Sequence, residues 1–332
     1  MKLVLFSTQQ YDRNFFNLFN SDSAFQIEFF EEALTRKTAD LAQGADAVCV
    51  FVNDKVNATV MEKLAGLGIK VLALRCAGFN NVDLEAAKKH NIKVCRVPAY
   101  SPRAVAEHAV AMILTLNRKT HKAYNRVREQ NFSLNGLLGF DLFGKTVGVI
   151  GTGNIGKAFC RIMKGFGCNV LAFDLHKDNE LIAEGIQYME IAQLLEQSDI
   201  ISLHCPLNNQ TKYLINDETI ASMKKGVMLI NTSRGGLINT NSVIAGLKSK
   251  HIAYLGIDVY EQEEQLFFRD LSANIIEDDT IQRLTSFPNV LVTAHQAFFT
   301  NEALEQITVT TLRSVTEMLN GVVLSNPAVA LV

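Results

Sequence analysis

The fold of this chain is decided by the stretch Gly151-Thr152-Gly153-Asn154-Ile155-Gly156. An apolar run at 146–150 precedes it and predicts a buried strand, and a helix-like stretch at 157–166 follows it. The next apolar run, 170–173, ends in Asp174. Strand, glycine-rich turn, helix, strand and acid, in this order, are the context in which a glycine-rich turn binds a dinucleotide.

The residue types in this stretch suit a pyrophosphate and a ribose. Glycines permit a tight turn and let the backbone approach the pyrophosphate. The helix that follows offers its first N–H groups and the positive end of its dipole to that anion. Asp174 would accept hydrogen bonds from the ribose diol. An ordinary glycine turn is the alternative, and the surrounding strands, helix and acid favour the cofactor site.

Length and composition set broad limits on the protein. The 332 residues favour two domains, and 48% apolar with 20% charged residues allow sizeable cores. The formal net charge is −2 with both signs scattered, so we expect no nucleic-acid partner and no anionic membrane. No apolar run approaches the ~20 residues of a transmembrane helix, and the N-terminal run stops at Ser7, too soon for a signal peptide.

The cysteines predict a reduced protein. They are far apart along the chain, form no CxxC pair, and are Cys49, Cys76, Cys95, Cys160, Cys168 and Cys205. Most lie in or next to apolar runs, which is typical of small core residues rather than of metal ligands or disulfide partners. We therefore expect a cytoplasmic location and no metal site.

Short apolar runs alternate with helix-like stretches almost throughout, which is the pattern of a parallel α/β protein. The strand candidates of the first hundred residues are Leu3–Phe6, Ile27–Phe30, Val48–Val52, Val71–Leu74 and Val94–Val97. Those of the second series are Thr146–Ile150, Val170–Phe173, Ile200–Leu203, Val227–Ile230, Leu255–Val259 and Val290–Thr293. Six strands in series suit a complete dinucleotide-binding sheet.

Two joints divide the chain. The first is 97–102, where Pro98 and Pro102 precede a helix-like run, and the second lies near 294–300, before a tail with helical spacing. We therefore predict that residues 101–299 form a cofactor domain. It is inserted into a second domain that consists of residues 1–100 and 300–332.

Chemically useful side chains follow the strands of the second series. Ligands of such sheets bind beyond the carboxyl ends of the strands. One strand leads to His204, the next to Arg234, the third to Asp258 and the acids after it, and the last to His295. An arginine, an acid and a histidine are therefore expected on the side that faces the cofactor.

These three residue types suit hydride transfer between a nicotinamide and a 2-keto acid. A histidine, with an ordinary pKa of about 6.5, can protonate the alkoxide that forms. A neighbouring acid favours the protonated histidine and orients it, and an arginine binds the substrate carboxylate with a bidentate fork. His295, Glu263 and Arg234 fit these roles, although Glu261 and Glu264 flank the chosen acid.

Each of these residues also has a plainer interpretation. Taken singly, the histidine could be a structural hydrogen-bonding residue, the arginine a surface charge and the glutamate a solvated loop acid. His204 could bind the cofactor or cap a strand end, and His108, in an apolar helix-like run, is expected to be packed. The proposed roles gain weight only when they are taken together.

The chain resembles the D-2-hydroxyacid dehydrogenases essentially end to end, and most closely their fermentative bacterial D-lactate branch. The stretches that carry the resemblance are 74–83 (LRCAGFNNVD), 97–102 (VPAYSP), 106–109 (AEHA), 151–156 (GTGNIG), 231–235 (NTSRG), 258–263 (DVYEQE) and 293–295 (TAH). The resemblance implies an α/β fold of two doubly wound parallel-sheet domains, with a Rossmann cofactor domain inserted into a flavodoxin-like substrate domain. It also implies NADH as the cofactor and a homodimer or homotetramer.

The resemblance assigns the catalytic trio. In the family the glutamate lies five residues after the aspartate of the D-V motif, which favours Glu263 over its neighbours. The arginine follows the N-T-S run and is Arg234, and the histidine closes the last strand of the cofactor domain and is His295.

The resemblance also implies the binding residues. The implied cofactor contacts are Gly151, Gly153, Asn154, Ile155, Gly156, Asp174, His204, Cys205, Pro206, Thr211, Thr232, Ser233 and Asp258. The implied substrate contacts are Cys76, Ala77, Gly78, Tyr100, Arg234 and Phe299. The backbone of the first three resembles the loop that receives the substrate carboxylate.

The expected function is the reversible, NADH-dependent reduction of pyruvate to D-lactate. Two alternatives remain, namely a dehydrogenase of bulkier D-2-hydroxy acids and a non-catalytic protein that senses dinucleotides. Tyr100 and Phe299 would crowd a large substrate side chain, which favours pyruvate. The complete set of arginine, glutamate and histidine argues against a protein that only senses a dinucleotide.

Overall fold

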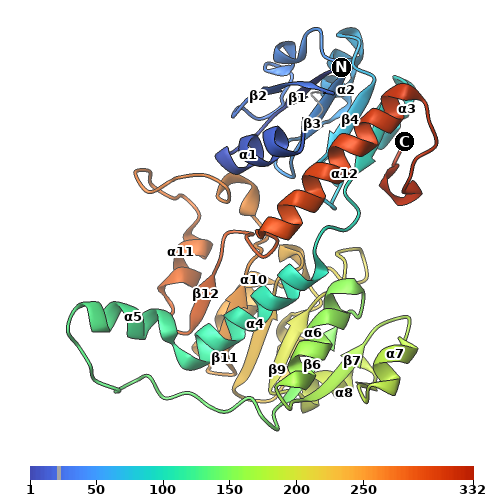
Figure 1. Cartoon of the computed structure of the whole chain (residues 1–332). Helices are drawn as coiled ribbons and strands as arrows, with labels where there is room; N and C mark the ends of the chain where they lie inside the picture. Colours follow the sequence, from blue (N-terminus) through green and yellow to red (C-terminus); the bar gives the residue numbers. More distant parts are fainter. Residues whose placement is uncertain (21–23) are drawn as a thin grey trace. The chain divides into compact units, whose positions relative to one another are not determined.

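The chain folds into two compact α/β units (Figure 1). The structure is a computed structural model that describes residues 1–20 and 24–332. Unit 1 consists of residues 1–101 and 299–332, and unit 2 consists of residues 102–298. Within the described residues, each unit contains one sheet whose strands are all parallel.

The sheet of unit 1 has the order β2-β1-β3-β4-β5. Its strands are β1 (Lys2–Leu5), β2 (Gln26–Phe29), β3 (Ala47–Val50), β4 (Val71–Leu74) and β5 (Lys93–Arg96). The helices around it are α1 (Gln10–Phe19), α2 (Ala58–Gly66), α3 (Leu84–Lys89) and α12 (Asn301–Asn320), with short 3₁₀ turns η1 (Ala39–Ala42) and η4 (Pro327–Val329). This strand order is that of flavodoxin-like folds, as predicted.

The C-terminal segment belongs to unit 1 because it packs there. Helix α12 lies against β4, β5 and α1, and the N–H of Leu331 donates to the carbonyl of Val94 over 2.8 Å. Every residue of β3 and β4 is buried, as expected for strands covered on both faces. The two ends of the chain therefore share one core.

The sheet of unit 2 has the order β12-β11-β10-β9-β6-β7-β8. Its strands are β6 (Thr146–Ile150), β7 (Asn169–Phe173), β8 (Gln187–Tyr188), β9 (Ile200–Leu203), β10 (Val227–Asn231), β11 (Ile252–Ile257) and β12 (Val290–Val292). The helices are α4 (Pro102–Arg118), α5 (Thr120–Arg128), α6 (Asn154–Gly165), α7 (Asn179–Ala183), α8 (Ile191–Gln197), α9 (Asp217–Ser222), α10 (Thr240–Lys248) and α11 (Asp279–Ser286), with 3₁₀ turns η2 (Gly235–Leu237) and η3 (Glu263–Gln265).

Alternate strand residues build two cores in unit 2, because successive side chains of a strand point to opposite faces. Val147 and Val149 pack with α4 and α6 on one face. Ile150 packs with the cluster that contains residues of α8, α9 and α10 on the other face. Both faces of the sheet are therefore covered, and the functional side chains lie at its carboxyl edge.

The structure differs from the sequence prediction mainly at strand ends. The predicted strand Leu255–Val259 is observed as Ile252–Ile257, and β8 was not predicted. β8 pairs with β7 through only two residues, which is too short for an apolar period to reveal. Unit 2 therefore has seven strands within the described residues, where six were predicted.

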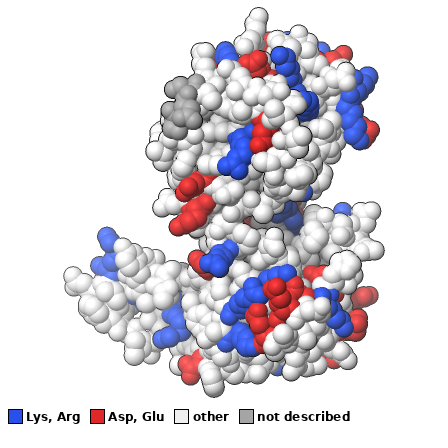
Figure 2. Space-filling model, turned by 45° about the vertical axis from the view of Figure 1, so that its right-hand side comes forward, with Lys and Arg blue, Asp and Glu red and all other residues white. Residues whose placement is uncertain are grey.

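The surface of unit 2 includes an exposed apolar segment and a region of mixed charge. Residues 120–143, which we call the arm, leave the body of the unit with α5 (Figure 1) and carry six large apolar side chains that are more than half exposed: Tyr124, Val127, Phe132, Leu134, Leu138 and Phe143. Figure 2 shows side chains of both charges interspersed on one face. Between α6 and the segment that begins with α7, Arg161 pairs with Glu180 and Glu184. None of the helices in the described ranges is long and apolar enough to cross a membrane.

Candidate active site

The turn after β6 requires glycine at two of its three glycine positions. Gly151 has a φ of +94°, and a Cβ there would lie 2.6 Å from the backbone nitrogen of Cys205. A Cβ on Gly156 would lie 1.9 Å from the carbonyl oxygen of Gly151, so only glycine lets α6 approach β6 this closely. A Cβ on Gly153 would meet nothing within 4 Å, which leaves open space beside that backbone. These three environments fit a turn, a backbone that a pyrophosphate approaches, and a close helix–strand contact.

The N-terminus of α6 is suited to an anion. The N-cap residue is Gly153, whose position provides no side chain to accept from the first N–H groups of the helix. Asn154 and Ile155 open the helix directly after the turn, and its first turn carries no acidic residue. The N–H groups and dipole of the helix therefore remain available to a pyrophosphate.

Asp174 lies directly after β7, in the position expected for the ribose acid. Its Oδ2 accepts from the backbone N–H of Thr152 over 2.6 Å, and its Oδ1 accepts from the N–H of His176 over 3.0 Å. The hydroxyl of Tyr188 donates to Thr152 Oγ1 over 2.8 Å and so supports the same corner. Sequence reasoning missed Tyr188 because it lies on the unpredicted strand β8.

Polar groups from the ends of β9 and β10 meet beside the turn. Ser233 Oγ donates to the carbonyl of Cys205 over 2.7 Å, and Thr211 Oγ1 donates to the carbonyl of Pro206 over 2.6 Å. Thr232 Oγ1 is buried and has no hydrogen-bond partner among the described residues. An unsatisfied buried hydroxyl indicates a missing ligand, which fits a cofactor that runs past this edge.

His204 is partly buried at the end of β9. Its ring lies 4.9 Å from the ring of Phe159, and its Nε2 is 2.9 Å from Ser202 Oγ. Burial lowers the pKa of His204 to about 3, so the imidazole is neutral near pH 7. A neutral histidine in this position suits packing or a neutral hydrogen bond better than proton donation.

His295 and Glu263 form a direct pair. His295 Nδ1 is 2.8 Å from Glu263 Oε1, and the two side chains are 20% and 19% exposed. This leaves Nε2 as the nitrogen that can serve a substrate. The ring of Phe268 lies 5.8 Å from the imidazole and shields one side of the pair.

Glu263 is held by its own loop. Its Oε2 accepts from the backbone N–H of Tyr260 over 2.9 Å, while the hydroxyl of Tyr260 donates to Asp278 over 2.8 Å. Asp278 in turn caps α11 through the N–H groups of Thr280 and Ile281. One carboxylate oxygen is thus used for position, and the other is left for His295.

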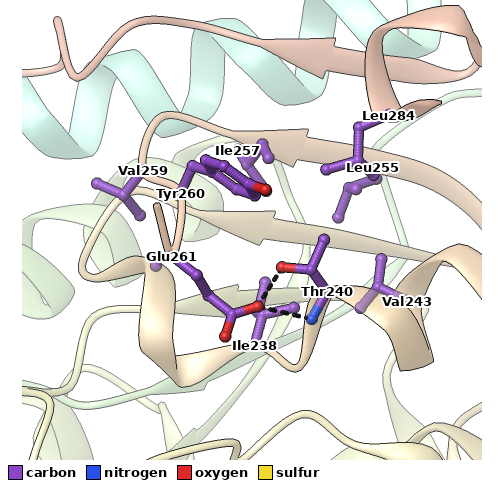
Figure 3. Close-up of a pocket in the computed structure, with 10 residues that line it drawn as sticks. Ile238, Thr240, Val243, Leu255, Ile257, Val259, Tyr260, Glu261 and Leu284 are labelled. Carbon is purple, nitrogen blue, oxygen red and sulfur yellow. Dashed lines mark hydrogen bonds between the residues drawn. The ribbon is translucent and has the colours of Figure 1, made fainter. Parts of the chain in front are cut away.

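The neighbouring acids are arranged differently. Glu261 Oε2 accepts from the N–H of Thr240 over 3.0 Å and from its hydroxyl, at the N-terminus of α10 (Figure 3). It therefore lines a small apolar pocket with Ile238, Val243 and Tyr260. Glu264 is exposed, whereas the carboxylate at 2.8 Å from His295 Nδ1 belongs to Glu263. Among the three acids, the geometry brings Glu263 to the histidine.

Arg234 lies between β10 and η2, one residue before a constrained glycine. A Cβ on Gly235 would lie 2.1 Å from the backbone of Tyr260, so the arginine loop and the glutamate loop are in close backbone contact. Arg234 Nη1 donates to the carbonyl of Ser233 over 2.7 Å. Within the described residues no hydrogen bond joins Arg234 to Glu263 or His295, which leaves the rest of its guanidinium for a ligand.

The backbone at His295 is held in an unusual conformation. His295 has a φ of +53°, and its N–H donates to the carbonyl of Asp258 over 2.8 Å. The fully buried Asp258 carboxylate accepts from Thr293 Oγ1 over 2.5 Å and from the N–H groups of Gln296 and Ala297 over 2.9 Å. These bonds can offset the strain of a left-handed residue at this turn. The expected contact of Asp258 with the cofactor stays a prediction, since the carboxylate is used here.

His108 supports the same turn from α4. Its Nε2 is 3.2 Å from Thr293 Oγ1 and 3.6 Å from Asp258 Oδ1. Burial lowers the pKa of His108, and the charge of Asp258 opposes that shift. The sequence suggested only a packed residue, and one of its polar partners, Thr293, lies 185 residues further along the chain.

The expected substrate residues Cys76, Ala77, Gly78, Tyr100 and Phe299 belong to unit 1. Cys76 Sγ donates to the carbonyl of Gly78 over 3.3 Å, which folds the loop after β4 back on itself. The N–H groups of Ala77 and Gly78 meet no acceptor among the residues that the structure describes. Successive open N–H groups of this kind can bind a carboxylate.

Phe299 has an aromatic neighbour that sequence reasoning missed. Its ring is 49% exposed and lies 4.8 Å from the ring of Tyr11, edge to face. Burial, with a smaller effect of Asp12, raises the pKa of Tyr11 to about 12, so its hydroxyl stays protonated. Tyr11 lies at the start of α1, far from any motif, so only the tertiary structure brings it to Phe299.

Comparison with known proteins shows the family to which this chain belongs. Residues 110–297 match the family described as "D-isomer specific 2-hydroxyacid dehydrogenase, NAD binding domain". The chain is 51% identical to D-lactate dehydrogenase of Escherichia coli over 97% of this chain and 98% of that one. It is also similar to the solved pyruvate reductase of Chlamydomonas reinhardtii (46% identity, TM-score 0.94, 98% of each chain). A third similar structure is D-lactate dehydrogenase of Lactobacillus jensenii solved with NAD⁺ (31% identity, TM-score 0.83, 98% of each chain).

The similarity to D-lactate dehydrogenase extends over both units, and the matched family domain binds NAD. The NAD-binding part of the family covers the glycine turn, Asp174, Arg234, Glu263 and His295. Relatives with about half of their residues identical match nearly the whole chain. The chain therefore belongs to the D-isomer-specific 2-hydroxyacid dehydrogenases, a family of NAD-dependent oxidoreductases.

Proposed function

We propose that this protein reduces pyruvate to D-lactate with NADH and catalyses the reverse reaction with NAD⁺. The observation that carries the proposal is the 2.8 Å pair of His295 and Glu263 at the carboxyl edge of the sheet that holds the glycine turn. Such a pair supplies a proton where hydride transfer creates an alkoxide. Names of close relatives support the substrate, since they include D-lactate dehydrogenase and pyruvate reductase.

Each residue of the trio has a distinct role in the proposed reaction. NADH, when bound, supplies a hydride to C2 of pyruvate. His295 Nε2 gives its proton to the carbonyl oxygen, and the Glu263 carboxylate stabilises the imidazolium before that transfer. Arg234 binds the substrate carboxylate and orients the keto acid. In the reverse direction His295 takes the proton from the lactate hydroxyl.

The residues of unit 1 are proposed to set the substrate's size and charge. The open N–H groups of Ala77 and Gly78 would receive the carboxylate. Tyr100 and Phe299 would crowd a long side chain, and Tyr11 adds an aromatic wall beside Phe299. We therefore expect pyruvate to be preferred over bulkier 2-keto acids.

We also propose that the protein is a cytoplasmic homodimer, with a homotetramer as the alternative. The six exposed apolar side chains of the arm support an oligomer, since such surface is typical of a contact. The six free, buried cysteines support a reducing compartment. Light scattering on the purified chain, and on a variant with Leu138→Glu in the arm, tests the assembly.

The activity is tested by following NADH oxidation with a panel of 2-keto acids, followed by chiral analysis of the product. We expect the highest kcat/KM with pyruvate and D-lactate as the product. A higher kcat/KM with a branched or aromatic keto acid would favour the bulkier-substrate alternative. NADH binding without turnover of any keto acid would favour the dinucleotide sensor.

A further inference from the structure

Residues 75–79, which follow β4 and which we call the carboxylate loop after their proposed role, are contacted by Arg96 on both sides of Gly78. Arg96 closes β5, and its register partner Leu74 is the last residue of β4, so the arginine lies beside the start of the loop. Arg96 Nη1 donates to the carbonyl of Ala77 over 2.8 Å. The guanidinium carbon also lies 5.1 Å from the centre of the Phe79 ring. One cationic side chain therefore holds both flanks of the loop.

The charge of Arg96 is not neutralised by a protein carboxylate. Within the described residues no aspartate or glutamate lies within ion-pair distance of it, and its Nε is buried without an acceptor. Arg75, the residue that starts the same loop, is different, since its Nε is 3.0 Å from Asp12 Oδ1. A partly buried cation without a counter-charge is costly unless an anion comes close to it. Arg96 thus indicates an anionic ligand near the loop.

The hydrogen bond to Ala77 affects the next N–H group. A trans peptide is planar, so the carbonyl of Ala77 and the N–H of Gly78 point in opposite directions. Because Arg96 takes the carbonyl, the N–H of Gly78 is directed away from the guanidinium, and no described residue accepts it. A cation bonded to a carbonyl polarises the peptide and makes its N–H a stronger donor.

We propose that Arg96 is a positioning residue that makes the loop selective for a carboxylate over a neutral group. It fixes the Ala77–Gly78 peptide, strengthens its N–H donor and adds positive potential to the region of the loop. The inference rests on the proposed function, in which this loop receives the carboxylate of the 2-keto acid. It predicts that the side chain acts on substrate charge rather than on the hydride-transfer step.

The test compares two substrates that differ in one charge, pyruvate and methyl pyruvate. In Arg96→Met we expect the KM for pyruvate to rise about tenfold, with little change in kcat, since a charge-assisted hydrogen bond is lost. The kcat/KM for methyl pyruvate should stay within about twofold of wild type. The preference for the charged substrate therefore falls about tenfold. An unchanged preference, or an equal loss with both substrates, would overturn the inference.

Arg13 offers a matched control within unit 1. Its guanidinium lies 5.3 Å from the centre of the Phe29 ring and donates to the carbonyl of Phe29 over 3.4 Å. Arg13→Met thus removes a carbonyl hydrogen bond and a ring contact away from the carboxylate loop, together with an ion pair to the exposed Glu31 over 3.6 Å. We expect it to leave the substrate preference unchanged, and a fall equal to that of Arg96→Met would contradict a specific role.

Two further variants separate charge from packing and serve if Arg96→Met does not fold. Arg96→Lys keeps a cation and a donor, whereas Arg96→Gln keeps a donor but no charge. We expect the lysine variant to retain most of the preference for pyruvate and the glutamine variant to lose it. Equal preferences in these two variants would overturn the inference.

The same data distinguish the two proposals. A wild-type chain that binds NADH but does not oxidise it with pyruvate would overturn the proposed function. A wild-type chain that is active, together with an Arg96→Met chain of unaltered preference, would overturn only the inference on Arg96.

Discussion

At the scale of single residues, the catalytic proposal depends on which acid touches His295. Glu261, Glu263 and Glu264 lie within four residues of each other, yet their surroundings differ. Glu261 accepts from the N–H of Thr240, the first residue of α10, while Glu263 bonds the backbone of Tyr260 with one oxygen and His295 with the other. One oxygen of Glu263 holds the loop and the other contacts His295. Removal of the charge of Glu263 should therefore change proton transfer by His295 without unfolding the loop.

Glu263→Gln should keep pyruvate reduction at low pH and lose it earlier as the pH rises. The glutamine removes the negative charge that favours the imidazolium of His295, so the protonated form persists over a narrower range. We expect the alkaline limb of the kcat/KM profile to move to lower pH, because the carboxylate charge beside His295 is lost. Glu261→Gln is the control, and it should leave the pH profile unchanged, because Glu261 contacts Thr240 rather than His295. A shifted profile in the control alone would assign the role to Glu261.

Arg234→Lys should weaken pyruvate binding and leave NADH binding nearly intact. Lysine offers a point charge where a planar fork is proposed, and the lost pairing is worth about 1.5–3 kcal/mol, which is roughly 10- to 150-fold in KM. Pyruvate kinetics and NADH fluorescence titration on one preparation check both halves. A wild-type KM for pyruvate would remove Arg234 from the carboxylate site.

Asp174→Ala should narrow the preference for NADH over NADPH. The Asp174 carboxylate is expected to bond the ribose 2′-hydroxyl and to repel a 2′-phosphate. Its loss should raise the KM for NADH more than that for NADPH. Tyr188→Phe is the control, since it removes a donor to Thr152 but leaves the charge of Asp174. Equal use of NADH and NADPH by the wild-type chain would show that Asp174 is not the acid that binds the ribose.

At the scale of elements, the glycine turn shows how one contact sets a binding edge. Gly156 lies inside α6, where glycine is usually unfavourable, yet the helix can approach the turn only because no Cβ is present. The same helix contains Gly165, around which a Cβ would meet nothing within 4 Å. Replacement by alanine is therefore expected to have opposite effects on stability at Gly156 and at Gly165.

Gly156→Ala should destabilise the protein and weaken NADH binding, because its Cβ would lie 1.9 Å from the carbonyl oxygen of Gly151. We expect a loss of at least about 1–3 kcal/mol, typical of overpacking. Gly165→Ala should instead be neutral or stabilise by up to about 1 kcal/mol. Thermal melting and NADH titration of both variants measure the difference. Equal melting temperatures for the two variants would contradict the close helix–strand contact.

At the scale of the whole molecule, buried histidines link stability to pH. Burial holds the pKa of His204 at about 3 and also lowers that of His108. In the unfolded chain a histidine titrates near 6.5, so below that pH the unfolded state binds more protons than the folded one. The stability that these neutral side chains contribute is present above pH 6.5 and is lost as the pH falls.

The unfolding free energy should therefore fall between pH 7.5 and pH 5.5, by up to about 1.4 kcal/mol for His204. His204→Asn should flatten this dependence, whereas a substitution of the exposed His176 should not. Urea unfolding at the two pH values measures the slopes. Parallel slopes for wild type and His204→Asn would mean that His204 is protonated in the folded chain.

Much of this protein is determined locally and can be predicted from its sequence. The glycine turn needs glycine at residues 151 and 156 because of backbone geometry, and the buried strands need continuous apolar runs because both faces are covered. Those requirements are met within short stretches, so the α/β class, the parallel sheets and the NAD-binding turn follow from residues 146–174 and their surroundings. The family resemblance further singled out Glu263 from the acids beside it.

Only the tertiary structure decided which side chains meet across long separations. Thr293 and His108 surround Asp258, Tyr188 supports Asp174, Tyr11 contacts Phe299, and Arg96 bonds Ala77. No period or spacing encodes such pairs, because they depend on strand order and on how loops leave the sheet edge. The pattern of the chain determines its elements, whereas the packing of those elements determines how each functional group is held.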